Sequence, residues 1–283
     1  MISSTFQICV IMEQLTNANL EDKTTNPFLV INQLPHDHFP KQYIWPKNDN
    51  DIVTEVLNAP VIDLHGFFIR DEEAIANATN LEKGVIAHAN RFSENLPWKE
   101  MLSFKYHENS SEELIVDFFH FNKFGQVDHN ILIQIKLIYQ KCYQSMRKLA
   151  LDLMELLEIS LGVDEQNYFK RLYEDCISLV RWNYYPKSNH PSLMHGVGRH
   201  HDPNTITVLY RDQVGGLEVF VDNKWRSVTP YPRTLVVNIG DTFKLKALSN
   251  GKYVSCLYRL SVNRFEPRLS VAFFLSPKGD KDL

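Results

Sequence analysis

The chain has 283 residues, of which 44% are hydrophobic and 23% charged, and its formal net charge is −4. These values are typical of an ordinary globular protein and exclude a chain too polar to bury a core. The small negative charge, without a cluster of basic residues, argues against a nucleic-acid-binding protein. No apolar run approaches the length of a membrane span.

The four cysteines (Cys9, Cys142, Cys176 and Cys256) are scattered and form no Cys-x-x-Cys pair. This spacing predicts isolated thiols in a reducing compartment and neither a zinc site nor a disulfide framework. The apolar segment from Ile8 to Met12 is too short for a signal-peptide core and lacks a basic flank. We therefore expect a cytoplasmic protein.

The N-terminal part of the chain has little periodicity up to residue 60, and residues 40–46 are typical of a surface strap. Leu96 to Glu100 is expected to form a loop with one aromatic anchor, Trp98. The patterns predict a strand over Ala59–Leu64, a helix over Asp71–Lys83 and an edge strand over Leu102–Tyr106.

The longest regular element is predicted over Asn130–Leu161. Apolar residues recur there with the 3.6-residue period of an amphipathic helix, at Ile131, Ile135, Ile138, Cys142, Met146, Leu149, Leu153 and Leu156. Gly162 follows where a helix needs a left-handed cap. We expect this helix to pack against a sheet.

From Ile177 onward the pattern changes to short strands separated by turns. Turn signals occur at Gly215-Gly216, Asp222-Asn223 and Asn250-Gly251. Strands are predicted over Ser178–Tyr185, Thr205–Tyr210, Leu217–Val221, Leu235–Ile239, Tyr253–Val262 and Leu269–Leu275. The expected fold is mainly β with a helical N-terminal part: a double-stranded β-helix, or jelly roll, packed against the long α-helix.

His200 and Asp202 have the clearest chemical meaning, because they stand two apart just before the predicted strand at Thr205. On an extended backbone, residues two apart point to the same face. An imidazole and a carboxylate on one face supply two ligands of the 2-His-1-carboxylate triad of non-haem Fe(II) oxygenases. The alternative is that both are ordinary turn residues, because His-x-Asp is a common tripeptide.

Arg268 and Ser270 share one face of the last long predicted strand. A guanidinium with a neighbouring hydroxyl is well suited to bind a carboxylate. Asn183 and Tyr185 share a face of an earlier strand, where the phenol would either donate to a ligand or complete the core. The turn from Asn238 to Asp241 is expected to carry no chemistry. Each of these features alone more often has a structural role. Their combination in this order indicates a functional site.

The motifs resemble those of plant 2-oxoglutarate- and Fe(II)-dependent dioxygenases, and most closely those of the gibberellin 20-oxidases. The resemblance covers about Phe39 to Lys281 and rests on NYYP (Asn183–Pro186), GVGRHHDP (Gly196–Pro203), DQVGGLEVFVDNKWRSV (Asp212–Val228), VVNIGDTF (Val236–Phe243), ALSNGKY (Ala247–Tyr253), PRLS (Pro267–Ser270) and FFLSPKGDK (Phe273–Lys281). Upstream, PKQYIWP (Pro40–Pro46), APVIDL (Ala59–Leu64) and LPWKEMLSF (Leu96–Phe104) match as well, and the last is the most specific to the gibberellin branch.

The resemblance implies that His200 and Asp202 hold Fe(II), and that Arg268 and Ser270 hold the distal carboxylate of 2-oxoglutarate beside Tyr185 and Asn183. We expect Arg268, Ser270, Tyr185, His200 and Asp202 to converge on one pocket inside the jelly roll, because they share faces on strands whose order matches the family. The implied reaction is O2-dependent oxidation of a gibberellin precursor at carbon 20, coupled to decarboxylation of 2-oxoglutarate to succinate, with ascorbate as reductant. No catalytic residue beyond the metal site is implied.

The resemblance also divides the chain into an N-terminal region, residues 1–175, irregular and then helical, and a jelly-roll domain, residues 176–277. The implied partner is a small diterpenoid acid as substrate. A monomer without nucleic-acid or membrane partners is expected.

This chain departs from the family at the third iron ligand. The resemblance implies a histidine in a Leu-His-Arg triplet, whereas the chain has Leu257-Tyr258-Arg259 and no histidine after His201. One alternative is that Tyr258 binds the metal as a phenolate, but the pKa of a phenol is usually about 10. The other is that its side chain fills the cavity and the remaining residues bind the metal weakly.

Two further departures concern length. The family carries a longer segment between Leu81 and Leu96, so we expect this region to be the least regular of the N-terminal half. The chain has additional residues at Phe243–Lys246, and an insertion of two in a strand would preserve its inside–outside alternation.

Three functions are consistent with these observations. The first is a gibberellin 20-oxidase-type dioxygenase, impaired by Tyr258. The second is a non-catalytic relative that binds 2-oxoglutarate or a small organic acid through Arg268 and Ser270. The third, a metal-free jelly-roll interaction protein, has little positive support.

Overall fold

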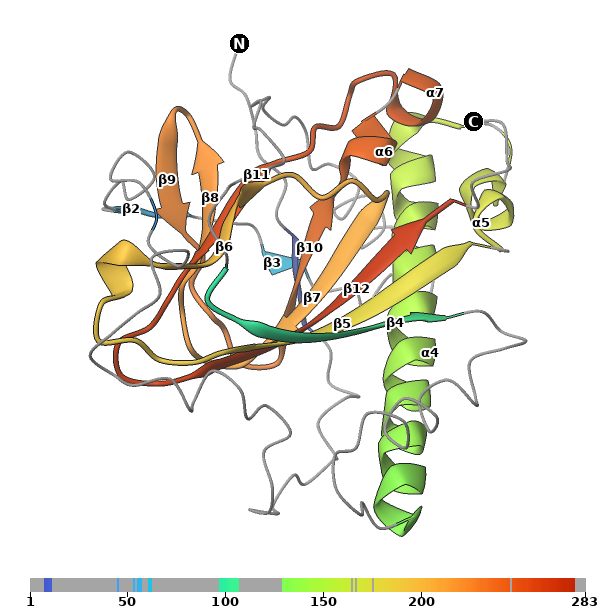
Figure 1. Cartoon of the computed structure of the whole chain (residues 1–283). Helices are drawn as coiled ribbons and strands as arrows, with labels where there is room; N and C mark the ends of the chain where they lie inside the picture. The colour runs from blue at the N-terminus through green and yellow to red at the C-terminus, as the bar shows by residue number, and fades with distance from the viewer. Residues whose placement is uncertain are drawn as a thin grey trace.

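Two β-sheets face each other, and a long helix packs on the outer face of the larger sheet (Figure 1). The computed structural model describes residues 8–11, 45, 53, 55–57, 61–62, 97–106, 129–163, 165, 167–174, 176–244 and 246–277. The predicted strap at residues 40–46, apart from Trp45, lies outside these ranges, as do the helix predicted over residues 71–83 and residues 81–96. No helix in the described part of the chain is long and apolar enough to cross a membrane.

The larger sheet has seven strands and the smaller has five. In spatial order, the larger contains β3 (Val61–Ile62), β1 (Ile8–Ile11), β10 (Thr234–Ile239), β7 (Ile206–Arg211), β12 (Arg268–Ser276), β5 (Ile177–Tyr185) and β4 (Glu100–Tyr106). The smaller contains β2 (Glu55–Val56), β9 (Lys224–Ser227), β8 (Leu217–Val221), β11 (Leu257–Ser261) and β6 (His195–His200). This architecture confirms the predicted jelly roll against a long helix.

Alternation along β12 separates the two faces of the larger sheet. Arg268 and Ser270 face the space between the sheets, whereas Phe273 and Leu275 point to the opposite side and are fully buried. The strand pairs antiparallel with β5 on one side and with β7 on the other. This central strand therefore carries polar groups into the interior of the jelly roll and apolar groups toward the helix.

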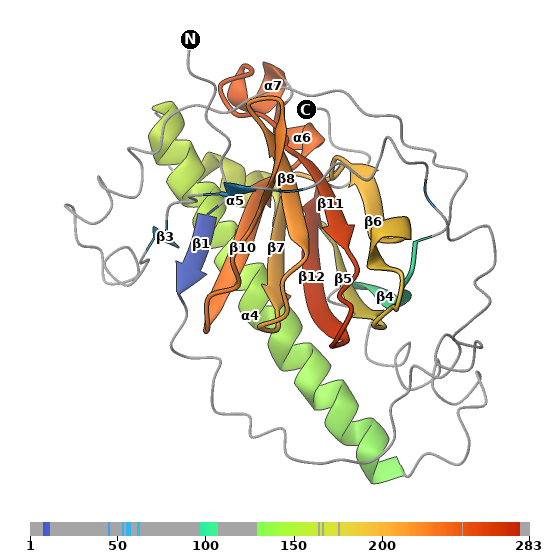
Figure 2. The same ribbon diagram turned by 90° about the vertical axis from the view of Figure 1, so that its left-hand side faces the viewer.

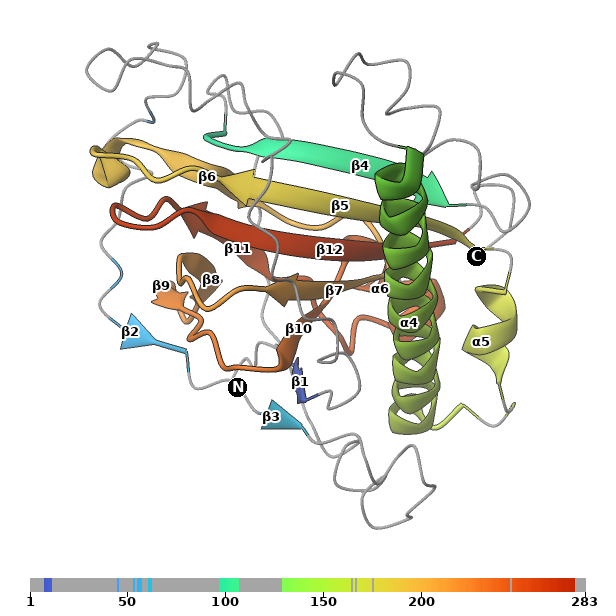
Figure 3. The same cartoon turned by 90° about the horizontal axis from the view of Figure 1, so that it is seen from below.

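The helix α4 (His129–Leu161) covers the outer face of the larger sheet, as predicted. Figure 3 shows it beside β5, β12 and β7, far from β8 and β9. Its buried face includes Met146, Leu149, Leu153 and Leu156. Gly162 ends the helix in the left-handed region at φ 69°, and the N–H of Val163 donates to the carbonyl of Glu158 (3.2 Å), which satisfies an otherwise unpaired helix-end carbonyl.

The predicted helix face was wrong at Ile138, which is half exposed, whereas Cys142 is partly buried and packs against the core as predicted. Figure 2 shows that the first turns of α4 extend past the described strands of the larger sheet.

Several other elements differ from expectation. Strands β1, β2, β6 and β9 were not predicted, and β11 begins only at Leu257, so residues 253–256 do not form the strand that was expected there. The additional residues after Asp241 were considered as part of a strand, whereas Asp241–Lys244 forms helix α6 and Lys246–Ser249 forms helix α7. Phe243 of α6 is fully buried against Phe169 of α5 (Tyr168–Leu172), so this segment contributes to the core.

The N-terminal region contributes strands to both sheets. β1 pairs antiparallel with β10, and β4 pairs with β5 at the edge where an edge strand was predicted. Trp98 is buried and donates from its indole N–H to the carbonyl of Pro186 at 3.1 Å, as expected of an anchor. The short 3-10 helix Pro191–Leu193 follows β5, and the backbone N–H of Trp45 donates to Leu193.

Phe273→Ala tests the contact between the larger sheet and α4. Phe273 is fully buried and lies against the ring of Tyr143 on α4, with centroids 5.8 Å apart. Removal of its ring should lower the free energy of unfolding by about 3–5 kcal/mol, measured by urea denaturation. Phe265→Ala, at a side chain that is 78% exposed, is the matched control and should change it by less than about 0.5 kcal/mol. Equal losses in both variants would contradict the assigned packing.

Candidate active site

A cavity of about 500 Å³ lies between the two sheets. Its size falls in the range of about 300–1,000 Å³ that is typical of small-molecule sites. The seven residues predicted from the sequence all line it: Asn183, Tyr185, His200, Asp202, Tyr258, Arg268 and Ser270. The convergence was expected of all of these except Asn183 and Tyr258, and for those five it is confirmed.

The wall formed by β5 and β12 is suited to bind a carboxylate. The register places Arg268 opposite Tyr185 and Ser270 opposite Asn183, so four polar side chains share one patch of the inner face. The guanidinium carbon of Arg268 lies 5.2 Å from the centre of the Tyr185 ring. Both side chains are buried.

Arg268 is the most unusual residue of this wall. Its side chain is 2% exposed, and none of its three guanidinium nitrogens has a hydrogen-bond partner among the described residues. The hydroxyl of Ser270 likewise has none. Burial lowers the pKa of Arg268 and raises that of Tyr185, and each group partly offsets the shift of the other. A buried guanidinium is stabilised by an anion, and Arg268 lines the cavity.

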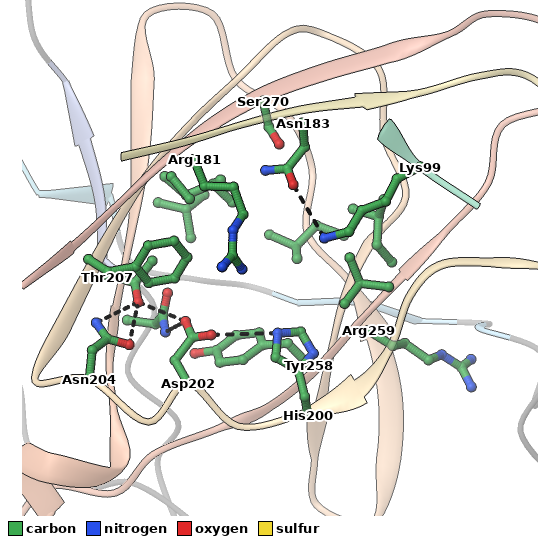
Figure 4. A pocket seen from close by; sticks show the side chains of 18 of the residues that line it. Lys99, Arg181, Asn183, His200, Asp202, Asn204, Thr207, Tyr258, Arg259 and Ser270 are labelled. Atoms are coloured by element: carbon green, nitrogen blue, oxygen red, sulfur yellow. Dashed lines mark hydrogen bonds and ion pairs between the residues drawn. The ribbon is translucent and has the colours of Figure 1, made fainter. Parts of the chain in front are cut away.

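His200 and Asp202 lie next to each other in the lining of the cavity (Figure 4). The pair precedes β7 as expected, but His200 is itself the last residue of β6, a strand that was not predicted. Nδ1 of His200 contacts the carbonyl of Gly198 at 2.8 Å, and Nε2 lies 3.5 Å from Oδ1 of Asp202. A hydrogen bond from Nδ1 orients the ring and directs Nε2 to the pocket.

The carboxylate of Asp202 is held by donors from two strands. Thr207 of β7 donates to Oδ2 at 2.7 Å and the amide of Asn238 of β10 at 2.8 Å. Burial would raise the pKa of Asp202, but the hydrogen bond and charge of His200, with these two donors, outweigh it and hold the pKa at about 2. Asn238 was expected to be a turn residue without chemistry. That expectation was wrong, because the pairing of β10 with β7 brings its amide to Asp202.

Tyr258 occupies the opposite side of this pair. It lies on β11 directly across from His200 on β6, and its side chain is buried. Its hydroxyl has no hydrogen-bond partner within the described ranges. Burial, followed by the charge and hydrogen-bonding influence of Cys256, raises the phenol pKa well above its usual value. The phenol is therefore neutral at physiological pH.

Two cations in the cavity were not anticipated as site residues. Lys99 precedes β4 and donates to Oδ1 of Asn183 at 3.3 Å, and Arg181 of β5 extends toward Asp202 and Tyr258 (Figure 4). Burial and the charge of Arg181 lower the pKa of Lys99 to about 8, although Asp202 acts in the opposite direction. For Lys99 the signal in the sequence was the LPWKE motif, which did not show that its lysine faces the pocket, and for Arg181 it was the alternation that it shares with Asn183 and Tyr185.

The sequence profile of the 2OG-Fe(II) oxygenase superfamily matches residues 176–277. Gibberellin 20 oxidase 3 of Arabidopsis thaliana is 37% identical over 94% of this chain and 82% of its own length. Gibberellin 20 oxidase 2 of Oryza sativa subsp. indica is 46% identical over 69% of this chain, which spans 48% of that relative.

Solved structures show the same fold. The crystal structure of JOX2 in complex with 2OG, Fe and JA superposes with a TM-score of 0.63 at 26% identity, over 86% of this chain and 80% of that one. The 2-oxoglutarate complex of AtDAO1, from Arabidopsis thaliana, has a TM-score of 0.54 at 23% identity over 77% of this chain and 81% of that one, and supports the fold alone.

The two facing sheets and the pocket between them define an oxygenase of the 2-oxoglutarate- and Fe(II)-dependent class. The chain belongs to the gibberellin 20-oxidase family of plants. It is accordingly an oxidoreductase of the dioxygenase type, and the comparisons favour this assignment over that of a non-catalytic relative.

The side chains present fit the two groups implied by this class to different degrees. Arg268 and Ser270 offer buried, unpartnered donors and fit a carboxylate of 2-oxoglutarate. His200 and Asp202 offer two ligands for iron, but a neutral phenol is a poor third ligand, and the described residues include no cluster of three His, Cys, Asp or Glu side chains suited to a metal. The iron triad of the class is therefore incomplete in this chain.

Lys99→Met tests the electrostatics of the pocket. Because the folded-state pKa of Lys99 is about 8 and its reference value is 10.5, the unfolded chain binds more protons between these values. Lys99 should therefore make the free energy of unfolding rise with pH across this window. Urea denaturation between pH 7 and 10.5 should show a smaller rise in Lys99→Met than in wild type. Lys148→Met, which removes an exposed lysine on α4, controls for the lost charge. An unchanged rise in Lys99→Met would contradict the buried placement of its amine.

Proposed function

We propose that this protein is a gibberellin 20-oxidase-type dioxygenase whose turnover is limited by Tyr258. The proposed reaction is oxidation of a gibberellin precursor at carbon 20, coupled to conversion of 2-oxoglutarate to succinate. The name and function of its relatives support this reaction, and the observation that carries it is the buried, unpartnered guanidinium of Arg268 in the shared pocket.

Within this proposal, Arg268 and Ser270 bind the distal carboxylate of 2-oxoglutarate. The phenol of Tyr185 and the amide of Asn183 line the same wall and exclude water from that carboxylate. Because charge-assisted hydrogen bonds are strong in a buried site, this wall would both hold and orient the cosubstrate.

His200 and Asp202 are the proposed metal-ligating pair, with Tyr258 at the position of the third ligand. Fe(II), when bound, would supply the O2 chemistry of the class. The roles of this chain are to orient the imidazole through Gly198 and to keep Asp202 ionised through Thr207 and Asn238. With one ligand missing, we expect weak iron binding and slow turnover.

The remaining assignments stay predictions. They are ascorbate as reductant, a diterpenoid acid as substrate, a cytoplasmic monomer, and no nucleic-acid or membrane partner. We also propose residues 176–277 as the catalytic unit and residues 1–175 as its support, since α4 backs the larger sheet and Lys99 reaches the pocket.

Succinate release tests the proposed reaction. With 2-oxoglutarate, Fe(II), ascorbate and a gibberellin precursor, wild type should release succinate slowly and only when the precursor is present. Arg268→Gln should abolish the release, because it removes the charge that binds the cosubstrate. Arg264→Gln changes an exposed arginine in the preceding loop and should leave it unchanged. Release that is independent of the precursor, or equal in Arg268→Gln, would refute the proposal.

Tyr258→His tests the broken triad. An added imidazole should raise the affinity for Fe(II) by at least about ten- to a hundred-fold. Mutation of a residue that only hydrogen-bonds to a metal ligand typically lowers metal affinity by that factor, and a ligand itself should matter at least as much. Anaerobic Fe(II) titration measures this, and Tyr258→Phe is the control, since it removes the phenol oxygen and should bind iron as weakly as wild type. If wild type binds as tightly as Tyr258→His while Tyr258→Phe binds weakly, Tyr258 is a working ligand and our assignment is wrong.

A further inference from the structure

Tyr258 lines the cavity, and its side chain is 5% exposed. Its hydroxyl makes no hydrogen bond within the part of the chain described. A buried hydroxyl without a partner is unfavourable by about 1–3 kcal/mol. A ligand that accepts from it would remove that penalty.

The charges around the cavity are unbalanced in favour of an anion. Arg268, Arg181 and Lys99 line it as cations, and the only carboxylate among its lining residues is Asp202. Arg259 also lines the cavity, but it is paired with Glu218 at 2.5 Å and stacks on Trp225. These side chains leave the cavity with a net positive charge, which favours an anion such as 2-oxoglutarate.

The two groups of donors stand on opposite sheets. Arg268 and Ser270 belong to β12 of the larger sheet, whereas Tyr258 belongs to β11 of the smaller sheet. Arg181 extends from the larger sheet toward Tyr258, and Lys99 points into the same space (Figure 4). A dicarboxylate held at Arg268 would therefore direct its other end to a region with a phenol donor and two cations.

We propose that this pocket binds 2-oxoglutarate without a metal ion, with Tyr258, Lys99 and Arg181 receiving the carboxylate and ketone oxygens at the end away from Arg268. The inference rests on the proposed binding of 2-oxoglutarate at Arg268 and Ser270. The replacement of an imidazole by a phenol then has two effects: it weakens the metal site and it adds a donor that stabilises the ligand in the absence of metal.

Calorimetric titration of 2-oxoglutarate into the full chain tests this inference, once with excess EDTA and once with Mn(II). Wild type should bind in EDTA with an affinity within about threefold of that in Mn(II). Tyr258→Phe removes one hydrogen bond to a charged group and should weaken binding in EDTA by about tenfold. Tyr258→His should bind weakly in EDTA and at least about tenfold more tightly in Mn(II).

The outcomes separate this inference from the proposed function. No binding of 2-oxoglutarate in either condition would refute the proposed function itself. Binding by wild type in Mn(II) but not in EDTA would overturn the inference and leave the proposed function standing. Equal affinities of wild type and Tyr258→Phe in EDTA, with the same melting temperature in both, would also overturn it.

Discussion

The buried guanidinium of Arg268 is the interaction on which the site depends. A buried charge that makes no hydrogen bond with the described residues is costly by several kcal/mol, so the fold must hold this side chain in place by other means. It does so through β12, which is paired on both sides and backed by Phe273 and Leu275 against the α4 side of the sheet. The apolar outer face of one strand thus stabilises the polar inner face that binds the anion.

The opposite wall of the cavity is less complete. Asp202 is held by three neighbours and remains ionised, so it is well placed as a metal ligand. Tyr258, at the position of the third ligand, is a neutral phenol and therefore a poor ligand for Fe(II). The same phenol is suited to donate to a ligand oxygen. Under our proposal, the neutral phenol of Tyr258 lets the pocket bind an organic anion without a metal ion.

The strands and the long helix could be predicted because alternation, turn residues and helical periodicity are local signals. The convergence of Arg268, Ser270 and Tyr185 followed as well, since paired strands with polar residues on one face must bring them together. Lys99 and the amide of Asn238 could not be assigned, because their roles depend on which strands become neighbours. Arg181 was missed although the alternation of its strand puts it on the same face as Asn183 and Tyr185. Strand β6, HGVGRH, lacks alternation of apolar and polar residues and contains two glycines, so no local pattern predicted it.

The most direct measurement is a crystal structure of the protein with 2-oxoglutarate and Mn(II). Our account predicts one carboxylate of 2-oxoglutarate on Arg268 and Ser270, and a Tyr258 hydroxyl that donates to the ligand and does not contact any metal at His200 and Asp202. A Tyr258 oxygen within bonding distance of the metal, or 2-oxoglutarate bound away from Arg268, would contradict it.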